Sequence, residues 1–226
     1  MKGEAAGWWT KPRKVSVVVD NDSWGLPWAE RLVDQCNEDG DTAALIRSQR
    51  DVPNGDLAFY LNCLNVAPPD VLKRNRGNLV VHASDLPRGR GFSPLTWMTL
   101  EGANEIPVCL LEAAEEADAG PIIFKDWVHF EGHELIDEMR TAIGAKTVEL
   151  AKRYLDEPRP LEGSPQTGES SFYPRRRRSD SEIDPQRSIA EQFEMFRVAD
   201  NVNYPVFFKH RGKTYELAIT KAEDGP

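Results

Sequence analysis

The sequence is poor in cysteine and has no long apolar run. Its three cysteines, Cys36, Cys63 and Cys109, are widely spaced and form no CxxC pair, which argues against a disulfide framework or a zinc site. The histidines show no metal-ligand spacing with carboxylates, so we assign no metal. No stretch approaches the roughly 18 apolar residues of a membrane helix, and the N-terminus lacks a signal-peptide pattern. We therefore expect a soluble, cytoplasmic protein with reduced thiols and no membrane partner.

Positive charge is also outweighed by negative charge, with 28 Lys and Arg residues against 37 Asp and Glu and a formal net charge of -9 over 226 residues. Neutralising nucleic-acid phosphates requires a basic surface, so this balance argues against nucleic acid as the main partner. It leaves room for a local basic pocket that binds a small anion. The length allows one α/β domain with a good core and a small appendage.

Apolar, β-branched segments alternate with amphipathic ones along the first two thirds of the chain. Strands that alternate with helices predict an α/β fold with an open, doubly wound, mostly parallel sheet. The expected strands cover residues 14–20, 43–46, 56–64, 78–83, 107–111 and 121–130, and the main expected helices cover residues 27–37, 94–101 and 133–155.

Composition changes after residue 155. Residues 156–170 are rich in proline, glycine and serine and predict a flexible linker between a first domain, residues 1–155, and a small cap, residues 171–226. The cap is too short for an independent domain of ordinary size. We expect it to contain a helix near residues 188–196 and a β-hairpin that turns at Arg211 and Gly212.

Two segments carry the residues suited to acid–base chemistry. His82 ends the fourth expected strand and begins HASDLPRGRG, and Asp118 begins the turn DAGPI. Ligands of such sheets bind beyond the carboxyl ends of the strands, which is where His82 should lie. Histidine exchanges protons near neutral pH, and a nearby carboxylate can hold it in one tautomer. A lone histidine would more often be a satisfied core residue, so the interpretation depends on the pairing with Asp118.

The same segments resemble the 10-formyltetrahydrofolate-dependent formyltransferases. Their motif has a histidine, then a serine, a proline and Arg-Gly, and their catalytic aspartate follows about three dozen residues later. Asp118 follows His82 by 36 residues, and the resemblance covers roughly residues 14–155. The matching residues of the first segment are His82, Ser84, Leu86, Pro87, Arg90 and Gly91.

The resemblance implies a Rossmann-like formyltransferase fold and 10-formyltetrahydrofolate as cosubstrate. His82 and Asp118 would be catalytic. The family has an asparagine two residues before the histidine, and Val80 stands at that position here. Asn78, on the same strand face, would lie about 13 Å from His82 at ~3.3 Å per residue, which is too far to take the place of that asparagine. Asn65, on the neighbouring loop, is therefore the candidate for the missing amide. The resemblance places the folate against Cys63, Leu64, Val66, Ala113, Glu115 and Asp118.

The tail, from SFYPRRRR to NYPVFF, resembles nucleotide-sugar N-formyltransferases, as does FSPLTW at residues 92–97. This implies a nucleotide-sugar substrate, nearest to a UDP-linked 4-amino-4,6-dideoxy sugar of the pseudaminic-acid type, and a homodimer. The implied substrate-binding residues are Ser84, Arg90, Gly91, Ser93, Pro94, Trp97, Tyr173, Arg175 and Arg176.

Plainer interpretations stand beside these. The arginine run at residues 175–178 is ordinarily a solvated loop, and Trp97 is more often a core residue than a stacking platform. Methionyl-tRNA or glycinamide ribonucleotide are alternative acceptors, although a tRNA acceptor calls for a basic domain. Val80 keeps open a folate- or nucleotide-binding relative without turnover, and water could replace the amine in a hydrolase.

Overall fold

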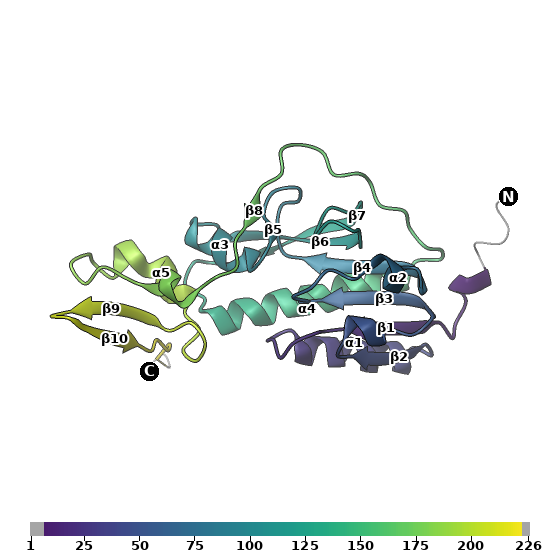
Figure 1. Ribbon diagram of the computed structural model, residues 1–226, viewed down its shortest axis with the longest axis horizontal. Helices are drawn as coiled ribbons and strands as arrows, with labels where there is room; N and C mark the ends of the chain where they lie inside the picture. Colours follow the sequence, from purple (N-terminus) through teal and green to yellow (C-terminus); the bar gives the residue numbers. More distant parts are fainter. Residues whose placement is uncertain (1–6, 223–226) are drawn as a thin grey trace.

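The computed structural model describes residues 7–222 and has a six-stranded sheet at its centre (Figure 1). The strand order is β2-β1-β3-β4-β6-β7. Strands β1 to β4 pair in parallel, whereas β6 and β7 pair antiparallel at one edge. The prediction of a doubly wound, mostly parallel α/β sheet is confirmed, with an antiparallel edge that the pattern did not specify. The strands are β1 Lys14–Val18, β2 Thr42–Ile46, β3 Gly55–Leu61, β4 Asn75–His82, β6 Glu105–Glu112 and β7 Ile122–His129.

Helices cover both faces of the sheet. Alternate strand residues such as Val17 and Phe59 pack against α1 and α4 in the main core, while Val18 and Tyr60 face the side of α2. Because side chains alternate along a strand, Val80 and His82 point to the α2 side, and this side carries the candidate site. The helices of this part are α1 Leu26–Glu38, α2 Pro69–Leu72, α3 Pro94–Leu100 and α4 Ile136–Leu155, with short turns η1 Gly7–Trp9 and η2 Gln49–Asp51.

The tail leaves the end of α4, returns along the sheet and forms the cap at the opposite end of the molecule (Figure 1). Its first strand, β8 Phe172–Tyr173, pairs in parallel with β5 Arg90–Gly91, which brings the tail onto the loop that follows His82. The predicted hairpin is present. The cap contains η3 Arg178–Ser181, η4 Ala190–Gln192, α5 Phe193–Arg197, β9 Val206–His210 and β10 Lys213–Leu217.

The connection at residues 156–170, predicted to be a linker, makes specific contacts with the sheet domain. Ser164 and Ile122 exchange two backbone hydrogen bonds of 2.8 Å, so the connection pairs with the start of β7. The backbone N–H of Gly163 donates to the Glu112 carboxylate at 2.9 Å. An edge strand offers unpaired backbone groups, and these hold the connection. Leu161, which packs against the main core, adds an apolar contact.

Candidate active site

A cavity of about 930 Å³ opens at the carboxyl ends of the parallel strands. His82 and Asp118 lie in its wall. One side is formed by the loop after β3 and the turn after β6, and the other by the β1–α1 loop, α4 and the cap. The sheet therefore places the two predicted catalytic residues in one space with walls from distant parts of the chain.

His82 is the last residue of β4 and only 8% exposed. Its Nδ1 lies 3.3 Å from Oδ1 of Asp118, and its Nε2 lies 2.8 Å from the carbonyl oxygen of Gly89. Both ring nitrogens thus face oxygen acceptors. The contact with Gly89 is a hydrogen bond, and the contact with Asp118 brings a carboxylate beside the imidazole. The ring is therefore held in one orientation by an acceptor on each side.

Asp118 reaches His82 from a tightly folded turn. Its φ is +54°, a left-handed conformation that aspartate tolerates better than most residues. Its Oδ2 accepts the backbone N–H of Gly91 at 2.9 Å, which joins the turn to the loop after His82. Gly120 allows the turn to close, because a Cβ at that position would lie 1.8 Å from the carbonyl oxygen of Glu112.

Val80 leaves an apolar patch where the resemblance calls for an amide. It lies two residues before His82, lines the cavity and is paired in register with Tyr60 of β3. The Asn78 amide nitrogen donates to the carbonyl oxygens of Leu72 and Asn75, and its oxygen faces the Tyr60 hydroxyl at 3.4 Å. Asn78 is therefore engaged elsewhere, as its distance from His82 predicts. Burial raises the pKa of Tyr60 to about 12, so this hydroxyl stays neutral.

Asn65 lines the cavity, but its amide nitrogen is already bonded. It donates to Oδ2 of Asp20 at 2.9 Å, and the backbone N–H groups of Leu64 and Asn65 donate to the same carboxylate at 2.7 and 3.2 Å. Burial by itself would raise the pKa of Asp20, but hydrogen bonds from Asn21, Leu64 and Asn65 outweigh it and hold the pKa below its ordinary value. In this arrangement one N–H of the Asn65 amide holds the loop after β3 to Asp20.

The predicted folate-side residues mostly lie together. Cys63, Leu64, Val66 and Ala113 line the same side of the cavity, and Glu115 does not. Leu64 and Val66 are 42% and 46% exposed, so they offer apolar surface to a flat ring. Burial raises the pKa of Cys63 to about 12, which keeps its thiol neutral and makes it a wall residue rather than a nucleophile.

Four of the predicted substrate-side residues line the cavity: Gly91, Ser93, Pro94 and Arg175. Arg175 is exposed, and its neighbour Arg176 is buried, contrary to a wholly solvated run. The Arg176 guanidinium donates to the carbonyl oxygen of Val198 and to Oγ of Ser181 at 2.8 and 2.9 Å. The two arginines therefore have different roles, with Arg176 holding the cap together.

The other predicted substrate-side residues do not line the cavity. Trp97 is half-buried rather than a core residue; it stacks on Tyr173 with ring centroids 6.4 Å apart and donates to the carbonyl oxygen of Pro174 at 2.9 Å. Ser84 is fully buried. Arg90 contacts Glu116 at 3.2 Å. Trp97 therefore joins α3 to the tail, and Arg90 joins the loop after His82 to the turn after β6.

The sequence did not indicate the remaining wall. It includes Trp24 after β1, Arg140 on α4, and Asp200 and Tyr204 from the cap. Arg140 contacts Asp200 at 2.9 Å. Burial alone would raise the pKa of Asp200, but hydrogen bonds from Asn203 and the Arg140 ion pair lower it to about 2. In the sequence, the only sign that α4 contributes to the cavity wall was Arg140, a charged residue on the otherwise apolar face of this helix.

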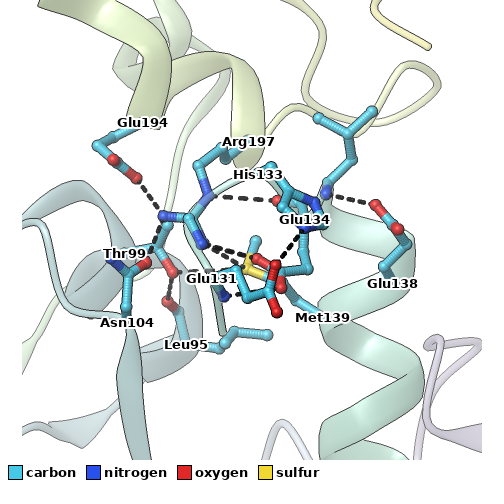
Figure 2. Close-up of polar contacts among 12 residues, drawn as sticks. Leu95, Thr99, Asn104, Glu131, His133, Glu134, Glu138, Met139, Glu194 and Arg197 are labelled. Atoms are coloured by element: carbon cyan, nitrogen blue, oxygen red, sulfur yellow. Dashed lines mark hydrogen bonds and ion pairs between the residues drawn. The ribbon is translucent and has the colours of Figure 1, made fainter. Parts of the chain in front are cut away.

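Arg197 fixes the cap to the start of α4 (Figure 2). Its side chain is 0% exposed. The guanidinium donates to Asn104 and Glu194, both at 2.8 Å, and to the carbonyl oxygen of Glu134 at 3.2 Å. A buried guanidinium with several well-placed acceptors defines one orientation. The cap's contribution to the cavity wall is therefore positioned from the α4 end.

Among residues 7–222 no group of three or more His, Cys, Asp or Glu side chains is placed to hold a metal ion. Over the same range no helix has the length and apolar character needed to cross a membrane.

Comparison with known proteins identifies relatives of this arrangement. The sequence profile of the formyl transferase family matches residues 27–154. A methionyl-tRNA formyltransferase from Thermodesulfovibrio yellowstonii is 24% identical over 147 residues, which cover 64% of this chain and 48% of the relative. The chain thus spans about half, or less, of the length of the curated relatives it matches.

Solved structures share the fold over nearly the whole chain. Methionyl-tRNA formyltransferase from Clostridium thermocellum superposes with a TM-score of 0.78 at 19% identity, covering 94% of this chain and 95% of that one. A 4-N formyltransferase from Francisella tularensis gives 0.74 at 17% identity, covering 95% and 100%. HypX from Aquifex aeolicus in complex with tetrahydrofolic acid gives 0.71 at 16% identity, covering 90% and 37%.

Proposed function

Because this chain belongs to the formyl transferase family, we propose that it transfers a formyl group from 10-formyltetrahydrofolate to the amine of a nucleotide-linked sugar. The observation that carries the proposal is the contact of His82 with Asp118, 3.3 Å apart, inside the cavity. The wall around Cys63 and Ala113 suits a flat folate ring. The wall around Arg175 and Arg140 suits a polar acceptor.

In the proposed reaction the acceptor amine attacks the formyl carbon, and a tetrahedral oxyanion forms. Collapse breaks the bond between that carbon and the folate N10, while one proton moves from the amine to N10. His82 carries this proton, and Asp118 keeps the ring oriented and compensates its positive charge. Because Gly89 and Asp118 occupy both ring nitrogens, one nitrogen must exchange its present partner for the reacting group.

The finer identity of the acceptor rests on the cap. Arg175 lies in the cavity wall, and no hydrogen bond or ion pair is formed by its side chain within residues 7–222. A guanidinium in that position can bind a diphosphate. With the tail resemblance and a 4-N formyltransferase among the structural neighbours, this favours a UDP-linked 4-amino-4,6-dideoxy sugar of the pseudaminic-acid type over a tRNA.

Val80 favours a second candidate, a folate-binding chain with little turnover. An oxyanion donor contributes about 10²–10³ in rate, so its loss alone would leave a slow enzyme. We therefore expect slow, amine-dependent transfer; a chain that binds folate without transfer is the alternative.

One experiment separates these candidates. The protein is incubated with 10-formyltetrahydrofolate alone, and with UDP- or dTDP-linked 4-amino-4,6-dideoxy sugars, while tetrahydrofolate release is followed. Release that depends on the amino sugar supports the proposed transferase. Equal release without an amine indicates a hydrolase. Absence of release, with tight binding of 5-formyltetrahydrofolate, indicates a binder and contradicts the proposal.

A further inference from the structure

One side chain of the connection between the sheet domain and the cap joins both loops of the candidate active site. The Gln166 amide nitrogen donates to the carbonyl oxygens of Asp118 and Gly120, at 2.7 and 2.8 Å. Its amide oxygen accepts from a terminal nitrogen of Arg90 at 2.8 Å. Gln166 thereby links the Asp118 turn to the loop that follows His82, although it does not itself line the cavity.

The backbone around Gln166 is itself fixed to the sheet domain by neighbouring contacts. Ser164 pairs with Ile122 through two hydrogen bonds of 2.8 Å, only two residues away. Gly163 approaches Pro121 so closely that a Cβ at that position would lie 2.7 Å from it. The side chain of Gln166 is therefore presented to the Asp118 turn from a fixed support.

The turn needs such a support because its geometry is demanding. Asp118 has φ of +54°, and its two carboxylate oxygens must reach His82 and the Gly91 N–H together. Removal of Gln166 takes the hydrogen-bond donor from two carbonyl oxygens of that turn. The carboxylate is then free to shift, and a displacement of about 1 Å can cost about 10²-fold in rate.

We propose that Gln166 is a positioning residue for formyl transfer, which acts by holding Asp118 against His82. The inference rests on the proposed function, because only a catalytic role of Asp118 makes its exact placement matter for rate. It assigns the connection at residues 156–170 a part in catalysis. Gln166 would then affect turnover and leave substrate binding largely unchanged.

The test compares three variants in the formyl-transfer assay. Gln166→Met keeps the length and removes all three hydrogen bonds. Gln166→Glu keeps an acceptor for Arg90 but cannot donate to the carbonyl oxygens of Asp118 and Gly120. Gln186→Met is the matched control, because Gln186 is exposed in the cap and its side chain forms no hydrogen bond within residues 7–222.

We expect kcat to fall about 10- to 100-fold in both Gln166 variants, with KM for 10-formyltetrahydrofolate within about threefold of wild type. Gln186→Met should match wild type. On an Asp118→Asn background, Gln166→Met should have no further effect on kcat, because the two act through one group. An unchanged kcat, a change in KM alone, or full additivity with Asp118→Asn would overturn the inference.

Hydrogen–deuterium exchange tests, without turnover, whether Gln166 holds the Asp118 turn in place. Peptides that cover residues 113–121 should exchange faster in Gln166→Met than in wild type or Gln186→Met, while the β1–β3 core stays unchanged. Equal exchange in that turn would overturn the inference. If the wild-type protein lacks transfer activity while Gln166→Met still exchanges faster than wild type in this turn, the proposed function is refuted and the structural role of Gln166 stands.

Discussion

If the proposed function holds, replacing Val80 by asparagine should raise the rate of formyl transfer. Val80 lines the cavity, points to the same face as His82 and precedes it by two residues. An asparagine there would present its amide beside the imidazole, next to the position of a developing oxyanion. One such donor is worth about 10²–10³ in kcat, and imperfect placement reduces this gain, so we expect a rise of at least about 10-fold.

The stability cost of this substitution should be small. Val80 is only partly buried and packs at the meeting point of two small apolar clusters. Full burial of a valine contributes about 1.5–3 kcal/mol, so partial burial next to a cavity corresponds to about 1 kcal/mol. The Asn amide faces the cavity, where it can be solvated, so no buried polar group is left without a partner.

The assay is steady-state formyl transfer at saturating 10-formyltetrahydrofolate, with Val80→Thr as the matched control. Threonine has the shape of valine and adds polarity, but its hydroxyl cannot reach as far as an amide. We expect Val80→Asn to raise kcat and Val80→Thr to leave it near wild type. A folded Val80→Asn variant that binds folate normally and gains no rate would refute the reasoning, because the donor would then not be missing.

Two further predictions concern the cap. Arg197→Met removes a fully buried guanidinium and leaves Glu134, Glu194 and Asn104 without their hydrogen-bond donor. The free energy of unfolding, measured in guanidinium chloride, should therefore fall by about 3 kcal/mol. A loss below about 1 kcal/mol would contradict the anchoring role. Asp200 has a pKa lowered to about 2, so its contribution is present above about pH 4 and is lost as pH falls toward 2. Asp200→Asn should therefore be less stable than wild type by up to about 2 kcal/mol at pH 7, and urea unfolding should show this difference shrinking between pH 4 and pH 2, whereas a pH-independent difference would count against the ion pair with Arg140.

Local pattern was sufficient for most of the sheet. Runs of apolar, β-branched residues, such as residues 14–20, are typical of buried parallel strands and therefore predicted strands. The hairpin turn was predicted at Arg211 and Gly212, between two runs that alternate apolar and polar residues, and both residues of the turn have positive φ. The pairing of His82 with Asp118 was predicted by spacing within the resemblance.

Contacts between distant segments could not be predicted in the same way. Gln166 lies in a segment whose composition indicates flexibility, yet backbone pairing at the edge of β7 holds it in place. In the sequence, Arg176 and Arg197 look like ordinary solvated arginines. Only the folded cap supplies the hydrogen-bond acceptors that allow their guanidinium groups to be buried. Asn65 was a reasonable candidate for the missing amide, and the structure bonds it to Asp20, a residue 45 positions earlier.

The most direct measurement is single-turnover formyl transfer by His82→Gln and Asp118→Asn, with 5-formyltetrahydrofolate affinity determined in parallel. If the two residues form the proton-handling pair, the transfer rate should fall by about 10²–10⁴ in His82→Gln, and substantially in Asp118→Asn, while folate affinity stays within a few-fold of wild type. Transfer at the wild-type rate by folded His82→Gln would contradict the account.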